Sequence, residues 1–185
     1  QPYATLLIAT GASAIKPPLP GLELPGVFTL RAIPDAQHIY QWIEQKQPQR
    51  AVIIGGGYIG LEMAEALHER GLQVAVVEML PQLLPNFDAD MVEEVTNHLA
   101  EKNVQVYTGE RVAAIARQES HLTVQLTAGT ALPAELVLVS TGVRPNSELA
   151  KAAGLKLGKS GAIRVDAQMR TSDPHIYAAG DCVEH

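Results

Sequence analysis

The residues with the clearest chemical meaning are three glycines, Gly55, Gly57 and Gly60, which follow the apolar run 51–54. Their spacing fits the pattern G-x-G-x-x-G. The first glycine of that pattern allows a tight turn, the second lets backbone approach a pyrophosphate, and the third lets a helix pack closely on a strand. The helix start would also offer unpaired N–H groups and a partial positive charge to phosphates. The turn therefore predicts a dinucleotide site.

The elements around the turn decide how much weight the pattern deserves, because a lone match is weak. We expect a helix over residues 58–70, ended by Gly71, and then a strand over 73–77 that ends at Glu78. Glu78 lies 18 residues after Gly60, near the position of the acid that binds adenosine ribose hydroxyls in this type of unit. A Gly-rich turn in an ordinary βαβ unit is the alternative. The order of strand, glycines, helix, strand and acid favours the dinucleotide site.

Glu78 also indicates which dinucleotide is bound. A carboxylate at this position accepts hydrogen bonds from the 2′- and 3′-hydroxyls of NAD, whereas it would repel the 2′-phosphate of NADP. NADP sites usually supply an arginine there, and residues 79–84 contain neither Arg nor Lys. We therefore predict NADH rather than NADPH.

The remaining pattern predicts an α/β fold, in which a Rossmann-like βαβαβ parallel sheet carries an added antiparallel β-hairpin or meander. The Pro/Gly-rich stretch 16–26 is typical of a crossover between domains. Beyond Pro145 we expect a short helix through Ala153, capped by Asn146. The other expected elements are strands at 3–9, 104–107, 136–139 and 162–165, helices at 34–44 and 89–102, and a hairpin formed by 111–116 and 122–126.

Composition limits the classes of partner. The content of 46% apolar and 18% charged residues is typical of a soluble globular protein, and no apolar run approaches the roughly 20 residues that span a bilayer. The net charge of −6 argues against a nucleic-acid partner, and we also expect no membrane partner. The single cysteine, Cys182, excludes an internal disulfide and agrees with a cytoplasmic location. The six histidines lack metal-ligand spacing, so we expect no metal site.

Five stretches in one order carry a resemblance to a known family. They are residues 7–12, 28–36, 55–62, 140–146 and 176–181. The chain resembles the middle of the FAD-dependent pyridine nucleotide-disulfide oxidoreductases, and most of all their coenzyme A-disulfide reductase and NADH oxidase branch. The resemblance implies an NAD-binding domain at 28–145, inserted into an FAD domain whose partial flanks are 1–27 and 146–185.

The resemblance also implies roles for single residues. Thr10 and Gly11 would lie near the FAD, and Asp181 would hydrogen-bond its ribityl chain. Tyr58 would cover the nicotinamide pocket against the flavin and swing aside for NADH. Glu62 would lie near the nicotinamide end, and residues 141–142 would line the same channel. The implied NAD set is Gly55, Gly57, Tyr58, Ile59, Gly60, Glu62, Glu78, Thr141 and Gly142.

The chemistry implied by the family is hydride transfer from NADH to FAD, followed by reduction of a disulfide, a sulfenic acid or oxygen. The redox cysteine and an FAD fingerprint would lie upstream of Gln1, and a dimerisation domain that makes the parent a homodimer would lie beyond His185. We therefore expect no catalytic residue in this chain. Alone it would be inactive, binding NADH weakly and FAD poorly. Ala4 departs from the family, whose members often have Asp there.

Two alternatives stay open. One is a flavoprotein of the NADH-dependent ferredoxin, rubredoxin or nitrite reductase type, in which the flavin passes electrons to a protein or metal centre. The other is a dinucleotide-binding module without turnover. The segment 29–35 favours the disulfide reductase and NADH oxidase branch, and Asp181 and Tyr58 argue against a module without turnover.

Overall fold

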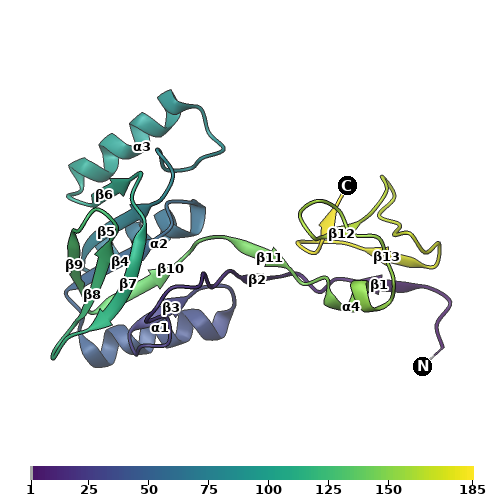
Figure 1. Ribbon diagram of the computed structural model, residues 1–185, viewed down its shortest axis with the longest axis horizontal. Helices are drawn as coiled ribbons and strands as arrows, with labels where there is room; N and C mark the ends of the chain where they lie inside the picture. The colour runs from purple at the N-terminus through teal and green to yellow at the C-terminus, as the bar shows by residue number, and fades with distance from the viewer. Residues whose placement is uncertain (1) are drawn as a thin grey trace. The chain divides into compact units, whose positions relative to one another are not determined.

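The computed structural model describes residues 2–185, which form two compact units (Figure 1). The larger unit is Ala14–Gly142. The smaller unit combines the residues up to Ser13 with Val143–His185. The two crossings carry the strands β2 (Ala12–Ala14) and β11 (Val143–Pro145), which pair with each other. The assignment of chain segments to an FAD domain and an NAD domain, with boundaries at 27/28 and 145/146, stays a prediction.

A five-stranded parallel sheet forms the centre of the larger unit (Figure 1). Its strands are β3 (Val27–Thr29), β4 (Arg50–Ile54), β5 (Gln73–Glu78), β6 (Gln105–Thr108) and β10 (Leu136–Val139), in the order β3-β10-β4-β5-β6. The helices are α1 (Ile33–Lys46), α2 (Tyr58–Glu69) and α3 (Ala89–Glu101). The predicted βαβαβ unit is confirmed as β4-α2-β5-α3-β6. The strand order reverses between β4 and β10, where open α/β sheets bind ligands.

Different layers cover the two faces of this sheet. On one face Ile53 and Val76 pack with α2 and α3 through Leu67 and Val92. On the other face lies the antiparallel sheet β7 (Val112–Arg117), β8 (Leu122–Leu126) and β9 (Ala131–Ala134). Neighbouring residues on a strand point to opposite faces, so a strand covered on both sides is apolar at every position. The predicted hairpin is thus present, and β9 extends it to a three-stranded meander.

The smaller unit pairs β1 (Leu6–Ile8) with β13 (Ile176–Ala178), and β12 (Ile163–Arg164) with β14 (Val183–Glu184), both in parallel. Its helix α4 spans Glu148–Ala152. The prediction that Asn146 caps this helix was wrong, because Ser147 is the N-cap residue. The Asn146 amide instead donates to the carbonyl oxygen of Thr10 (2.9 Å).

An ion pair joins the amino ends of β4 and β10. The carboxylate of Glu135, which precedes β10, accepts hydrogen bonds from the guanidinium of Arg50 (Nε–Oε1 3.1 Å) and from its backbone N–H (2.9 Å). Burial opposes ionisation of Glu135, but the hydrogen bonds from Arg50 outweigh it, so the pKa of Glu135 lies below its usual value. The backbone carbonyl of Glu135 accepts the indole N–H of Trp42 (3.0 Å), which ties α1 to the same point.

The substitution Glu135→Gln is expected to lower the free energy of unfolding near neutral pH by about 1–2 kcal/mol, since charged hydrogen bonds are lost at a partly solvated site. The pKa of Glu135 is lower in the folded than in the unfolded state. Its contribution is therefore present above the unfolded carboxyl pKa of about 4 and disappears as the pH falls through the folded value. Denaturant titrations at several pH values, followed by fluorescence of the single tryptophan Trp42, measure both effects.

Glu119→Gln is the matched control, because that carboxylate is exposed. A stability difference between wild type and Glu135→Gln that stays constant from neutral pH to below the carboxyl range would contradict this account of the ion pair.

Candidate functional site

The glycine turn lies at the carboxyl end of β4, between the ends of β5 and β10. Gly55 adopts a φ of 112°, and its N–H donates to the carbonyl oxygen of Val77 (2.8 Å). The hydroxyl of Ser140, directly after β10, donates to the carbonyl oxygens of Gly55 (3.1 Å) and Ile54 (3.2 Å). Neighbouring strands therefore hold the turn on both sides at the point where the strand order reverses.

The three glycines of the fingerprint have different surroundings. A Cβ on Gly55 would lie 2.4 Å from the carbonyl oxygen of Ser140, and one on Gly60 would lie 2.0 Å from the carbonyl oxygen of Gly55. Packing within the protein thus closes both positions, and a side chain at either one would require neighbouring atoms to shift. A Cβ on Gly57 would meet no atom within 4 Å, and its φ of −84° suits any residue. The open space beside Gly57, at the N-cap of α2, fits the pyrophosphate that the fingerprint places there.

Glu78 closes the turn from the side of β5. Its side chain is buried, and its two carboxylate oxygens accept the N–H groups of Gly56 and Leu80, each at 2.8 Å. The N–H of Leu84 donates to the carbonyl oxygen of Gly56 (3.0 Å), so both backbone groups of Gly56 are bound. Each carboxylate oxygen keeps acceptor capacity for a ribose hydroxyl. That role of Glu78 stays a prediction.

Sequence reasoning missed Gly56 and Ser140. A Cβ on Gly56 would lie 2.4 Å from Cδ2 of Leu83, so a glycine is needed at a position that the fingerprint leaves free. The signal for Gly56 was a third consecutive glycine. The signal for Ser140 was a polar residue ending the apolar run 136–139.

Tyr58, Ile59 and Glu62 lie in the first turns of α2. Tyr58 is 60% exposed, and its ring meets Phe87 edge to face with centroids 5.8 Å apart. Glu62 is exposed and four residues further along, so it shares a side of the helix with Tyr58. Ile59 is half-buried.

Thr141 and Gly142 continue from β10, next to the glycine turn. The Thr141 hydroxyl donates to the carbonyl oxygen of Ile15 (3.2 Å), and the N–H of Ile15 donates to the carbonyl oxygen of Gly142 (2.9 Å). Gly142 has a φ of 104°, a conformation that favours glycine. Both residues follow β10, the strand adjacent to β4, and their role in lining a nicotinamide channel stays a prediction.

The predicted flavin residues gather at one edge of the smaller unit. Thr10 and Gly11 follow β1 and Asp181 follows β13, and the carboxyl ends of these paired parallel strands meet at the same edge. Asn146 fixes this edge, because its carbonyl accepts the Thr10 hydroxyl (2.5 Å) and its N–H donates to the Gly11 carbonyl (2.9 Å). Asp181 is exposed on it. The polar groups at this edge could therefore hydrogen-bond a polar chain of a cofactor, such as the predicted ribityl chain.

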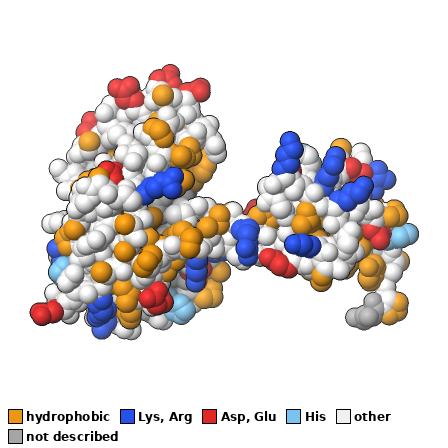
Figure 2. Space-filling view, viewed as in Figure 1, with side chains coloured by type: hydrophobic (Ala, Val, Ile, Leu, Met, Phe, Trp, Pro, Cys, Tyr) orange, Lys and Arg blue, Asp and Glu red, His pale blue; other side chains and the backbone are white. Residues whose placement is uncertain are grey.

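Cys182 takes no visible part in the predicted site. Cys182 is fully buried, with its Sγ 3.2 Å from the carbonyl oxygen of Ala179. Within residues 2–185 no cluster of His, Cys, Asp and Glu could hold a metal ion. Acidic side chains gather over α3 (Figure 2), whose sequence includes Asp90, Glu93, Glu94 and Glu101. No helix in the described part of the chain has the length and apolar character to cross a membrane.

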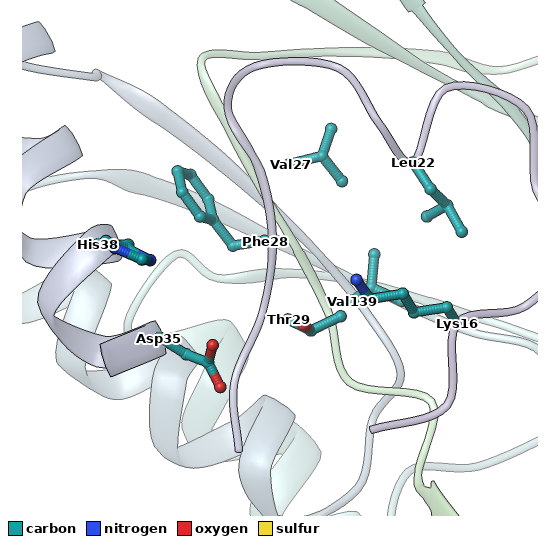
Figure 3. Close-up of a pocket in the computed structure, with 8 residues that line it drawn as sticks. All are labelled: Lys16, Leu22, Val27, Phe28, Thr29, Asp35, His38 and Val139. Carbon is teal, nitrogen blue, oxygen red and sulfur yellow. The ribbon is translucent and has the colours of Figure 1, made fainter. Parts of the chain in front are cut away.

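A separate cavity of about 170 Å³ opens beside the edge strand β3 (Figure 3). Its polar members include Lys16 and Asp35, and Asp35 also accepts the N–H groups of Arg31 and Ala32 (both 2.9 Å) at the start of α1. The lining of the cavity includes none of the predicted dinucleotide-binding residues. Its lining is Lys16, Leu22, Val27, Phe28, Thr29, Asp35, His38 and Val139.

Comparison with known proteins decides the family. Residues 1–185 match the pyridine nucleotide-disulphide oxidoreductase family over their whole length. The chain belongs to this family. Members are FAD-dependent enzymes that use NAD(P)H. The NADH oxidase of Methanocaldococcus jannaschii is 45% identical over 98% of this chain, and the match covers 40% of that protein.

Solved structures of the family show the same fold. A NAD-dependent persulfide reductase from A. fulgidus is 48% identical, with a TM-score of 0.93. The match covers 98% of this chain and 34% of the reductase chain. The NADH-bound, water-forming NADH oxidase from Lactobacillus brevis is 30% identical, with a TM-score of 0.92 over 99% and 40%. Its engineered NADPH-bound variant is 28% identical with the same TM-score and coverage. The chain spans about 40% of the length of the NADH oxidase and of a CoA-dependent NAD(P)H sulfur oxidoreductase from Pyrococcus furiosus.

The different surroundings of the glycines lead to a test. Gly55→Ala is expected to lower the free energy of unfolding by more than about 1 kcal/mol, because alanine is strained at a positive φ and would collide with Ser140. Gly57→Ala should leave stability unchanged or raise it slightly, yet weaken NADH binding about tenfold or more by filling the open space. Thermal denaturation and isothermal titration of the intact protein measure the two quantities. Full NADH affinity in Gly57→Ala would contradict the assignment of that space to the pyrophosphate.

Proposed function

We propose that this chain forms the NADH-binding half of a hydride-transfer site in a flavoprotein oxidoreductase. The whole protein would pass hydride from NADH to FAD and then reduce a disulfide, a sulfenic acid or oxygen. The observation that carries the proposal is the glycine turn at the strand-order reversal, closed by packing at Gly55 and Gly60 and open at Gly57. Membership of a family of NAD(P)H-dependent flavoproteins supports the same conclusion.

The residues of the chain would bind and orient the cofactors. The N–H groups at the start of α2 would hold the pyrophosphate beside Gly57, and Glu78 would accept the ribose hydroxyls at the end of β5. Tyr58 would cover the nicotinamide pocket, and residues 141–142 would line it. When bound, NADH supplies the hydride and FAD accepts it. In the smaller unit Thr10, Gly11 and Asp181 would hold the ribityl side of the flavin.

The choice of NADH over NADPH is supported by a comparison with the L. brevis oxidase. Its NADPH-using variant replaces a glycine and an aspartate that are 18 residues apart, the same separation as Gly60 and Glu78. In that variant the residue after the aspartate becomes arginine, at the position that corresponds to Met79. Removal of the acid and addition of a cation thus accompany the use of NADPH in a relative. This chain keeps the acid and lacks the cation.

NADH is expected to bind the intact protein roughly tenfold or more tightly than NADPH, because the Glu78 carboxylate would face the 2′-phosphate. The double substitution Glu78→Ala/Met79→Arg should reverse that order. Isothermal titration with both dinucleotides measures the preference, and Met79→Arg alone is the control that keeps the acid. Thermal denaturation must accompany it, since Glu78 also holds Gly56. Equal or tighter binding of NADPH by the wild-type protein would overturn the assignment.

A second candidate acceptor is a protein or metal centre in place of a disulfide or oxygen. The nitrite reductase [NAD(P)H] large subunit of Klebsiella oxytoca is 38% identical over 96% of this chain. This similarity favours a protein or metal centre as the acceptor. The segment 29–35 supports the disulfide reductase and NADH oxidase branch. The family resemblance supports a homodimer for the whole protein. The single cysteine supports a cytoplasmic location.

The intact protein is expected to bind FAD and to lose its visible flavin absorbance when NADH is added. Asp181→Ala should lower the FAD content on purification, because the proposed partner of the ribityl hydroxyls is removed. NADH oxidation measured with oxygen, a small disulfide and ferredoxin then separates the candidate acceptors. An intact protein that binds FAD but keeps its flavin oxidised in excess NADH would disprove the proposed hydride transfer.

A further inference from the structure

The loop that follows Glu78, residues 79–88, runs back over the glycine turn. Leu83 is fully buried, and its Cδ2 lies 2.4 Å from the position that a Cβ on Gly56 would take. The N–H of Leu84 donates to the carbonyl oxygen of Gly56 (3.0 Å). The loop therefore starts at the proposed ribose-binding acid and is fastened to the middle of the turn.

The same loop ends on the ring of Tyr58. Phe87 meets this ring edge to face at 5.8 Å and 71°. The backbone of Phe87 is held at two points, because its N–H donates to the Leu84 carbonyl (2.9 Å) and its carbonyl accepts from Nε2 of Gln82 (3.0 Å). Tyr58 is 60% exposed, whereas Phe87 is partly buried against the core. Phe87 is thus the fixed member of the pair, and Tyr58 is the ring that is free to move.

We propose that Phe87 is a positioning residue that holds Tyr58 in its resting orientation, so that NADH must break this aromatic contact when it displaces the ring. The inference rests on the proposed function, in which Tyr58 covers the nicotinamide pocket. An edge-to-face pair contributes enough to change an affinity by about two- to tenfold. The contact therefore sets how tightly NADH binds without touching the nicotinamide itself.

The test compares Phe87→Leu, which removes the ring but keeps apolar volume, with Phe87→Tyr, which keeps the ring. In the intact protein, Phe87→Leu should bind NADH about two- to tenfold more tightly by isothermal titration, because no contact has to be broken. Phe87→Tyr should retain the wild-type affinity. Phe87→Met serves as a second variant if the leucine variant is unstable.

Fluorine NMR of the intact protein labelled with 3-fluorotyrosine follows Tyr58 directly, and Tyr58→Phe identifies its signal. Without NADH, Phe87→Leu should move this signal and Phe87→Tyr should move it less. An unmoved signal in Phe87→Leu, or an NADH affinity that is unchanged or weakened, would overturn the role of Phe87. If NADH fails to move the Tyr58 signal in the wild type, the proposed role of Tyr58 fails instead, and the comparison of variants without NADH still decides whether Phe87 holds the ring.

Discussion

The close approach of α2 to the end of β4 is the constraint on which the rest of the site depends. At Gly60 the helix passes so near the Gly55 carbonyl that a Cβ would lie 2.0 Å from its oxygen. This approach places the helix start beside Gly57, where its N–H groups would face the proposed pyrophosphate. The Ser140 hydroxyl binds the same Gly55 carbonyl from the strand on the other side. A Cβ at Gly60 would therefore press the helix against the Gly55 carbonyl, whereas a Cβ at Gly55 would press the turn against the Ser140 carbonyl.

A second set of contacts gives Glu78 two tasks. Its carboxylate orders the turn through Gly56 and the following loop through Leu80, and it would also select the adenosine ribose. These tasks are compatible, because an ionised carboxylate offers more acceptor sites than two N–H groups use. They also mean that a substitution at Glu78 would disturb the backbone at Gly56 and Leu80 together with any contact to a ribose. The side chain of the next residue, Met79, is instead exposed.

The sequence predicts the main elements because their signals are local. The apolar run at 51–54, the glycine spacing and the helical period at 58–70 each lie within a few residues, and the structure confirms the strand and the helix. The partners of these elements are not local. Ser140 reaches Gly55 across 85 residues, and Asn146 reaches Thr10 across 136. An asparagine just before a helix predicts an N-cap, but the Asn146 side chain binds the distant Thr10 carbonyl instead. The local sequence does not show that Thr10 is available as a partner.

The aromatic pair shows the same limit at the site itself. Tyr58 belongs to a recognisable motif, whereas Phe87 lies in the irregular loop 79–88. This loop has no periodic pattern of apolar residues from which its contacts could be predicted. The loop reaches Tyr58 because Leu83 is buried beside Gly56 and Leu84 bonds to it, at a φ of 44°. Residues at the adenosine end and the nicotinamide end of the proposed site are thus joined through one short segment. A ligand that reorders this segment at Glu78 would therefore also act on the ring at Tyr58, and these contacts would couple binding at the two ends of the proposed site.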